Sequence, residues 1–234
     1  MKTGLLAPLF VVALSATACS SSSPAQDPGL SGDGQGSAAS APDANPQGVA
    51  YPTDHIGTNP RNGSRAGDRI ANYKFLGYPD GDSTKPLQPV SLANYFDPTG
   101  TNYKLIHIQA SGSWCIHCQN EIKAAAPLAA QLKDLKIVWI VSLAEGGTPG
   151  KPSTHDDLNN WVQRFNAPYP QVLDPGNANL GPFYDAAALP WNANISAKTM
   201  EILSADVGGI ETSDGILKDL QDYLNTVDSP NGLK

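Results

Sequence analysis

Apolar residues along this chain form short continuous runs that alternate with stripes at helical spacing. The runs 103–109, 136–142 and 170–174 are short and are flanked by polar or turn-forming residues, which is the pattern of buried strands. After the first and the second run, apolar residues recur every three or four positions, which predicts helices. The two stripes are Ile122, Ala125, Ala126, Ala129 and Leu132, and then Leu158, Trp161, Val162 and Phe165. This order of strands and helices predicts an α/β domain.

The C-terminal part of the chain continues with two more strands and a helix. We expect a short helix over 176–185, strands over 192–196 and 200–203, and a last helix that begins near Thr212 or Ser213. Pro127 lies inside the first helical stripe and is expected to kink or break that helix. The inner face of the last helix is expected to contain Ile216, Leu217, Leu220, Tyr223 and Leu224.

Residues 1–18 have the features of a secretory signal peptide. Lys2 supplies a positive charge, and an apolar core of about ten residues follows it, which is too short for a transmembrane helix. Ala16 and Ala18 fit a cleavage site directly before Cys19. A bacterial lipoprotein would be cut at the same bond and acylated on Cys19, whereas ordinary secretion would leave Cys19 as a free thiol.

Residues 19–50 are rich in Ser, Gly, Ala and Pro, and they cannot bury enough apolar surface to fold. We therefore predict a disordered linker there and one folded domain over 51–234. A linker of about 30 residues reaches roughly 30 Å, which suits a domain that is tethered to a membrane. The sequence thus predicts a lipid-anchored protein of the bacterial cell envelope that faces the periplasm, with a secreted soluble protein as the alternative. The net charge of −7 argues against nucleic acid and against an anionic membrane surface as partners.

Cys115 and Cys118 stand where the first predicted strand ends and the helix begins. The first thiol is therefore expected at the helix N-terminus, where free N–H groups and the helix dipole favour a thiolate. Two intervening residues in a helical turn let the second sulfur reach the first. The pair is predicted to be a reactive dithiol, which attacks a substrate disulfide and then resolves the mixed disulfide itself.

The surroundings of this pair resemble the thioredoxin-like superfamily. Trp114 directly precedes the first cysteine, as it usually does in thioredoxin-like active sites. Leu189-Pro190 is similar to the cis-proline that opens a sheet strand in that superfamily, and Glu121 resembles the Cys-x-x-Glu of TlpA-type membrane-attached reductases. The resemblance extends over approximately residues 65–228.

The resemblance implies a thioredoxin-like fold, with a central mixed sheet flanked by helices, an N-terminal β-hairpin that opens at 67–76, and an inserted helix and strand over 153–174. It also implies thiol–disulfide oxidoreductase activity without a cofactor. Cys115 would attack, Cys118 would resolve and form the redox disulfide with it, and the backbone of Leu189 ahead of the proline would pair with a substrate strand. The partners would be protein thiols and disulfides in the envelope and a redox partner that the sequence does not identify.

Two side chains near the pair have open roles. Gln109 stands where thioredoxins have a buried carboxylate that relays the proton of the resolving thiol, and Gln cannot titrate. Glu121 either takes over this role or is a solvated residue in the first turn of the helix. His117 follows Ile116 between the cysteines. A histidine at this position resembles the active sites of disulfide isomerases and periplasmic oxidases. A protonated His117 would stabilise a thiolate on Cys115, and the alternative is an exposed residue without a role.

The cysteine pair has other interpretations. A zinc site would need two more ligands, and the four histidines are scattered. Covalent haem is excluded, because Gln119 follows Cys118 where haem attachment needs His. A structural disulfide is a further alternative, although a disulfide that closes so short a loop stabilises a protein little. A thiol peroxidase is another, although that class has Thr where Gly112 stands. A module that binds a metal ion or a partner is the last alternative.

His107 is expected to be a hydrogen-bonded histidine of the core. Trp191 is expected to pack beside Pro190, and contact with a partner peptide is the alternative. The substrate and the direction of electron flow stay open.

Overall fold

A computed structural model describes residues 1, 37–54, 64–184 and 188–229. Cys19 lies outside these residues, together with most of the predicted signal peptide and linker. No helix within the described ranges is long and apolar enough to span a bilayer.

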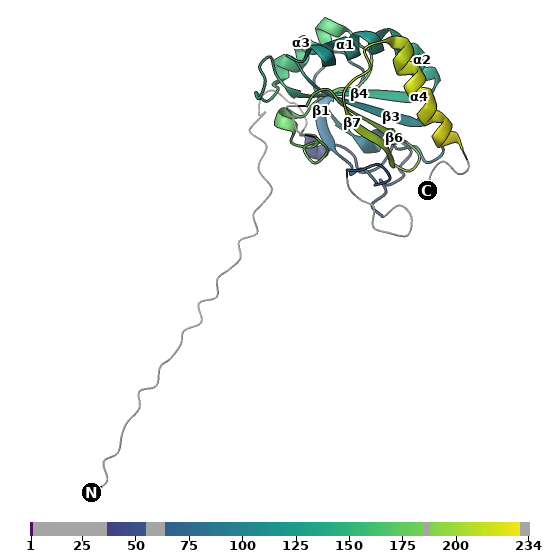
Figure 1. Cartoon of the computed structure of the whole chain (residues 1–234). Helices are drawn as coiled ribbons and strands as arrows, with labels where there is room; N and C mark the ends of the chain where they lie inside the picture. Colours follow the sequence, from purple (N-terminus) through teal and green to yellow (C-terminus); the bar gives the residue numbers. More distant parts are fainter. Residues whose placement is uncertain (2–36, 55–63, 185–187, 230–234) are drawn as a thin grey trace. The chain divides into compact units, whose positions relative to one another are not determined.

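In the described part of the chain, seven strands form one mixed sheet in the order β2-β1-β5-β4-β3-β6-β7 (Figure 1). The neighbours β3, β4 and β5 are parallel, and every other neighbouring pair is antiparallel. The strands are Lys74–Tyr78 (β1), Gln88–Ser91 (β2), Leu105–Gly112 (β3), Ile137–Glu145 (β4), Gln171–Leu173 (β5), Trp191–Ser196 (β6) and Ile202–Val207 (β7).

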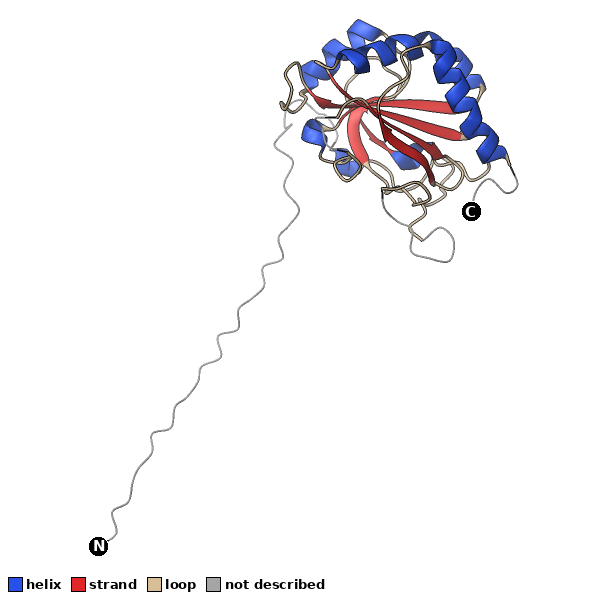
Figure 2. Cartoon of the chain, viewed as in Figure 1, coloured by secondary structure: helices blue, strands red, loops and turns tan. Residues whose placement is uncertain are grey.

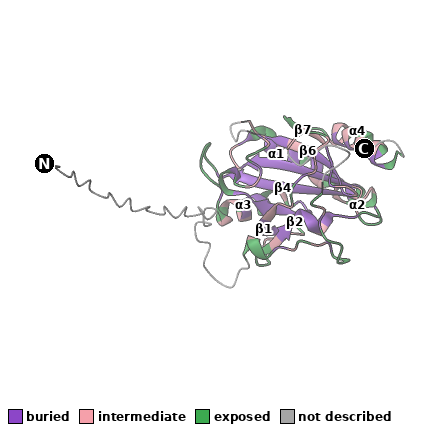
Figure 3. Ribbon diagram, turned by 90° about the horizontal axis from the view of Figure 1, so that it is seen from below, coloured by how far each residue is buried: buried purple, intermediate pink, exposed green. Residues whose placement is uncertain are grey.

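β3 and β4 lie in the middle of the sheet, and every residue of both strands is buried (Figure 3). A parallel strand that is covered on both faces needs apolar residues in succession, because neither face meets water. This burial explains the continuous apolar runs at 103–109 and 136–142, and it confirms that both are buried strands.

Four α-helices of the described residues cover one face of the sheet and share one apolar core with it (Figure 2). The opposite face is covered by 3₁₀ turns and irregular segments, which form a second core. This arrangement confirms the predicted α/β class with a central mixed sheet. The helices are Ile116–Ala125 (α1), Ala129–Asp134 (α2), His155–Phe165 (α3) and Ser213–Asp228 (α4), and the 3₁₀ helices that cover the second face include Leu92–Tyr95 and Pro175–Asn177.

The starts of α3 and α4 are fixed by side chains. Thr154 and Asp157 form a capping box at α3, in which each side chain accepts the backbone N–H of the other residue. At α4, Thr212 Oγ1 accepts the N–H of Gly215 at 3.3 Å. The start of α4 was predicted from the sequence, and α3 with β5 forms the insertion expected over 153–174.

Pro127 interrupts the helix that follows the cysteines, as predicted. α1 ends at Ala125, a 3₁₀ turn occupies Ala126–Leu128, and α2 begins at Ala129. Proline has no N–H to donate to the preceding turn, and its ring clashes with the carbonyl four residues earlier. The active-site helix is therefore short.

The prediction of a helix over 176–185 is wrong. The described part of this segment contains the 3₁₀ helix Pro175–Asn177, followed by turns. Gly176 and Asn177 have φ angles of 64° and 62°, which an α-helix cannot contain.

The N-terminal β-hairpin is present, but it begins later than expected. β1 and β2 pair antiparallel, with Lys74 opposite Ser91. Residues 67–70 instead lie along the start of β7, where the N–H of Gly67 donates to the carbonyl of Ile202 at 2.7 Å. The segment 67–76 therefore pairs with two different parts of the sheet: its first residues with the start of β7, and its last residues with β2.

Residues 37–50, which their composition placed in the linker, pack on the domain. Asn45 Nδ2 donates to the carbonyl of Phe96 at 2.9 Å, and Ser91 Oγ donates to the carbonyl of Pro42 at 2.7 Å. Polar contacts of this kind hold the segment in place with few large apolar side chains. Hydrophobic composition therefore did not reveal that it belongs to the domain.

Candidate active site

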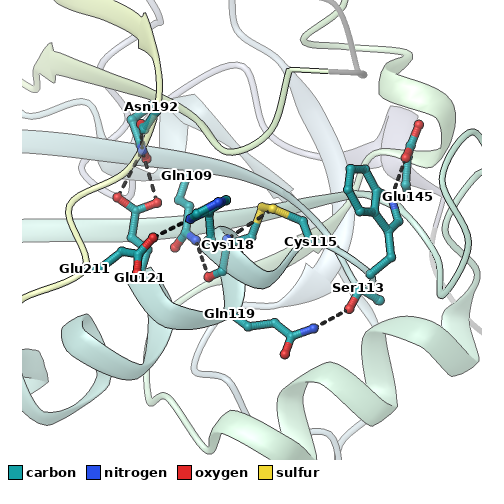
Figure 4. The surroundings of a disulfide bond; sticks show 12 residues. Gln109, Ser113, Cys115, Cys118, Gln119, Glu121, Glu145, Asn192 and Glu211 are labelled. Atoms are coloured by element: carbon teal, nitrogen blue, oxygen red, sulfur yellow. Dashed lines mark hydrogen bonds and ion pairs between the residues drawn. A yellow bond between two sulfur atoms is a disulfide. The ribbon is translucent and has the colours of Figure 1, made fainter.

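Cys115 and Cys118 form a disulfide at the junction of β3 and α1 (Figure 4). Cys115 is the N-cap of α1, and its Sγ accepts the N–H of Cys118 at 3.1 Å. Both cysteines are buried, with 2% and 0% of their surface exposed. A thiolate formed on Cys115 by reduction would therefore face an N–H group at the positive end of a helix.

Trp114, which directly precedes Cys115, is held by Glu145, the last residue of β4. The indole Nε1–H donates to Glu145 Oε2 at 2.6 Å, and Glu145 is buried. A Cβ at Gly112 would lie 2.9 Å from the indole nitrogen and 3.2 Å from Leu189 Cδ1. A Thr at this position, as in the peroxidase class, would collide with the indole where it lies here.

The Leu189–Pro190 peptide bond is cis, as the resemblance implied. It immediately precedes β6, in which Trp191 pairs with Ala110 near the end of β3. Trp191 is only 1% exposed, and its ring stacks on Tyr184 with centroids 5.2 Å apart. Trp191 therefore packs in the core beside the cis-proline, and the prediction that it packs beside Pro190 is confirmed.

Gln109 is buried and holds the backbone of the second cysteine in place (Figure 4). Its Nε2 donates to the carbonyl oxygen of Cys118 at 3.0 Å, and its Oε1 accepts Nε1–H of Trp139 at 3.2 Å. Both ends of the amide are thus occupied. Gln109 fixes the start of α1, but it cannot exchange a proton with the thiol.

Glu121 lies on the same helix as Cys118 and is only 1% exposed, so the interpretation of Glu121 as a solvated residue is wrong. Its carboxylate accepts two contacts from Asn192 Nδ2, at 3.0 and 3.1 Å, and the N–H of Ile210 at 2.9 Å (Figure 4). Burial raises the pKa of Glu121 to about 7, although these hydrogen bonds oppose the rise. A carboxyl group with such a pKa can exchange protons near neutral pH.

The burial of Glu121 has two causes. It shares the inward face of α1 with Cys118, Ile122 and Ala125, all of which are buried. In addition, the loop between β7 and α4 closes over the carboxylate, and a Cβ at Gly209 would lie only 2.7 Å from Glu121 Oε2. Glycine at 209 is what permits this approach.

His117 points to solvent and pairs with an acidic residue from the loop before α4. Its side chain is 67% exposed, and its Nδ1 lies 2.6 Å from Glu211 Oε1. Asn120 Nδ2 donates to Glu211 Oε2 at 2.9 Å, and the bonds from His117 and Asn120 lower the pKa of Glu211. Ile116, beside His117, is 55% exposed. The effect of His117 on Cys115 stays a prediction.

His107 lies in the core between two asparagines. Its Nδ1 is 2.9 Å from Asn194 Oδ1 and its Nε2 is 3.1 Å from Asn192 Oδ1, while the ring centroid lies 3.9 Å from that of Trp139. Burial lowers the pKa of His107 to about 4. The prediction of a hydrogen-bonded core histidine is confirmed. Within the described ranges, no group of three or more His, Cys, Asp and Glu residues is arranged to hold a metal ion.

No family model and no curated protein matches this sequence. Among solved structures, it is similar to AhpC of Enterococcus faecalis, with 13% identity and a TM-score of 0.53 over 73% of this chain and 98% of that chain. It is also similar to a putative thiol:disulfide interchange protein DsbE of Chlorobium tepidum, with 13% identity and a TM-score of 0.52 over 70% of this chain and 99% of that chain. The chain has a thioredoxin-like fold. At such identities the likeness shows the fold, and the activity must be argued from the site.

The thioredoxin-like fold also brings two residues to the site that the sequence did not single out. Asn192 contacts Glu121 from β6, and Glu211 contacts His117 from the loop before α4. A signal for Asn192 was present, because polar residues at 192 and 194 alternate with buried apolar ones on β6. The sequence holds no comparable signal for Glu211, whose contact depends on the path of the loop.

Proposed function

We propose that this chain is a thiol–disulfide oxidoreductase of a bacterial cell envelope that exchanges disulfides with protein substrates. The proposal rests on one observation: the Cys115–Cys118 disulfide starts at the N-cap of α1, next to a buried carboxyl group with a pKa near neutrality. A bond between residues three positions apart removes little entropy from the unfolded chain, so it is poorly suited to a purely structural role.

In the first step, the thiolate of Cys115 attacks one sulfur of a substrate disulfide. The Cys115–substrate S–S bond forms, the substrate S–S bond breaks, and one substrate sulfur leaves as a thiolate. The N–H of Cys118, which contacts Cys115 Sγ at 3.1 Å, supports the negative charge on the attacking sulfur. The dipole of α1 acts in the same direction.

In the second step, Cys118 resolves the mixed disulfide. Its thiol loses a proton and its sulfur attacks Cys115 Sγ, so that the internal disulfide forms and the second substrate sulfur leaves as a thiolate. Two electrons pass from the protein to the substrate, and the reverse sequence oxidises a substrate dithiol. Glu121 is the proton acceptor in this step, because Gln109 cannot titrate and Glu121 lies one helical turn from Cys118.

A substrate segment would dock beside the pair, next to Ile116. The backbone of Leu189 ahead of cis-Pro190 supplies the pairing edge, and the exposed side chain of Ile116 offers apolar contact. Trp114, which precedes Cys115 and is fixed by Glu145, offers a further apolar surface. These contacts are generic, which suits a protein that acts on several thiol-containing partners.

The domain is proposed to be held at the membrane by lipid on Cys19, through a linker that ends near residue 37. The support is the sequence alone: a signal-like segment, a cysteine directly after a fitting cleavage site, and a polar tract. A multiply acylated cysteine anchors a protein stably, whereas an acidic surface without lipid gives no attraction to anionic membranes.

Trapping of substrates tests the proposed chemistry. A Cys118→Ser variant is expected to accumulate mixed disulfides with envelope proteins, because the resolving sulfur is absent. Cys115→Ser is the matched control: it retains the same number of cysteines and is expected to trap little. Equal trapping by both variants, or by neither, would point to a structural bond and refute the proposal.

A further inference from the structure

Asn192 contacts both Glu121 in the redox site and His107 in the core. Its Nδ2 contacts both carboxylate oxygens of Glu121 and also the carbonyl of Gly208, at 2.8 Å. A carbonyl oxygen and a carboxylate can only accept, so the nitrogen of this amide must face them. The amide oxygen must then face His107 Nε2, at 3.1 Å, and that ring nitrogen must carry a hydrogen. The orientation of Asn192 is thus determined on three sides.

The charges around Glu121 make this donor important. Glu211, from the loop before α4, and Asp219, from α4, both disfavour an ionised Glu121, as burial does. The buried hydroxyl of Tyr169 is close enough to feel the same carboxylate, but it donates no hydrogen bond to it. Ile210 donates one backbone N–H. Among the described residues, Asn192 is the side chain that donates to Glu121.

We propose that Asn192 is a positioning residue of the redox site: it holds Glu121 ionised and oriented to take the proton of Cys118, while His107 fixes the direction of its amide. This inference rests on the proposed function and extends it. In the resolving step, the Cys118 S–H bond breaks and its proton passes to Glu121. The sulfur's electron pair then forms the bond to Cys115, the S–S bond between Cys115 and the substrate breaks, and the substrate sulfur leaves as a thiolate. His107 and Asn192 touch no reacting atom and act only through Glu121.

The test is the pH dependence of the resolving step. Reduced full-length protein is mixed with increasing concentrations of oxidised glutathione, and the reaction is followed by tryptophan fluorescence. The limiting rate, which no longer depends on the glutathione concentration, is the rate of the resolving step. In the wild type this rate is expected to rise with pH around a midpoint near 7, because Glu121 must be ionised to accept the proton. In Asn192→Ala the lost donor raises the pKa of Glu121, so the midpoint moves to higher pH and the rate at neutral pH falls about tenfold.

Asn194→Ala is the matched control. Asn194 contacts the other ring nitrogen of His107 from the same strand, but it does not contact Glu121. Asn194 also donates to Asp219, and the loss of that bond can only weaken the repulsion between Asp219 and Glu121, so the midpoint is expected not to rise above that of the wild type. Asn192→Asp keeps the shape and replaces the N–H by an oxygen, and its midpoint is expected to move at least as far as that of Asn192→Ala. In a Glu121→Gln background the pH midpoint is expected to disappear, and Asn192→Ala should then change nothing further.

The outcomes separate the two proposals. If the reduced wild type exchanges normally and the midpoints of Asn192→Ala, Asn192→Asp and Asn194→Ala coincide, the positioning role is refuted and the proposed function stands. If the reduced wild type does not react with oxidised glutathione, the proposed function itself fails. The carboxyl-carbon NMR shift of Glu121 across the same pH range gives the pKa directly and does not depend on turnover. An equal Glu121 pKa in the wild type and the Asn192 variants would overturn the inference as well.

Discussion

Glu121 and His107 are predicted to make opposite contributions to the pH dependence of stability. Burial raises the pKa of Glu121 from 4.5 to about 7 and lowers the pKa of His107 from 6.5 to about 4. Each difference corresponds to a change of about 3 kcal/mol in the free energy of unfolding across the respective pH range. Each of these contributions is therefore large for a domain whose free energy of unfolding is about 5–15 kcal/mol.

The two signs follow from proton binding. The folded protein binds the Glu121 proton more tightly than the unfolded chain, so its contribution is lost as pH rises from 4.5 to about 7. The folded protein binds the His107 proton less tightly, so stability is gained as pH rises from about 4 to 6.5. In the wild type the two contributions nearly cancel over the pH range that they share.

Single substitutions should remove this cancellation. Glu121→Gln is expected to become more stable as pH rises, and relative to the wild type it should gain about 3 kcal/mol between acid and neutral pH. His107→Gln should show the opposite trend. Urea unfolding of the oxidised protein, followed by tryptophan fluorescence at several pH values, measures both. Asp43→Asn is the control: this carboxyl group is exposed, its pKa is lowered by its bonds to Lys74 and Asn72, and it does not act on Glu121 or His107, so its variant should parallel the wild type above pH 5.

Parallel stability profiles for the wild type and Glu121→Gln would contradict this reasoning. They would mean that Glu121 binds its proton equally in the folded and the unfolded chain. A buried carboxyl group enclosed by the loop of Gly209 could not do so.

Three further results are expected. His117→Ala should weaken the acidity of the Cys115 thiol and make the reduction potential more negative, by about 30 mV for each tenfold change in acidity; an unchanged potential would leave His117 without a redox role. Gly209→Ala should destabilise the protein by about 1–3 kcal/mol, because its Cβ would meet the Glu121 carboxylate, and this loss should shrink in a Glu121→Ala background. Cys19→Ala should release the protein from membranes or block its processing; a wild type that is soluble after signal removal would exclude the lipid anchor.

The sequence predicted those parts of the fold whose burial follows a regular period. β3 and β4 are rich in apolar residues because both faces are covered, and α3 and α4 show apolar stripes because one face is covered. The segment after β5 was mistaken for a helix, because positive φ angles at Gly176 and Asn177 leave little trace in hydrophobicity. The packing of residues 37–50 depends on polar contacts, which composition does not reveal.

For the active site, local geometry was predictable and long-range contacts were not. The position of Cys115 at the N-cap of α1 follows from the adjoining strand and helix. The burial of Glu121 was left open by the sequence, because it is completed by Gly209, almost ninety positions away along the chain. The pairing of His117 with Glu211 depends on the same loop. Such contacts are set by how the loop between β7 and α4 packs, which no local pattern specifies.

The claim that Cys115 and Cys118 form an exchangeable disulfide is tested most directly by their reduction potential. Equilibration of the folded chain with reduced and oxidised glutathione gives this value. The helix N-terminus and the N–H of Cys118 favour the reduced form, so we expect a potential less negative than about −270 mV, the value of thioredoxin. A potential below about −300 mV, or a bond that glutathione does not reduce, is the behaviour of a structural disulfide and would contradict the proposed function.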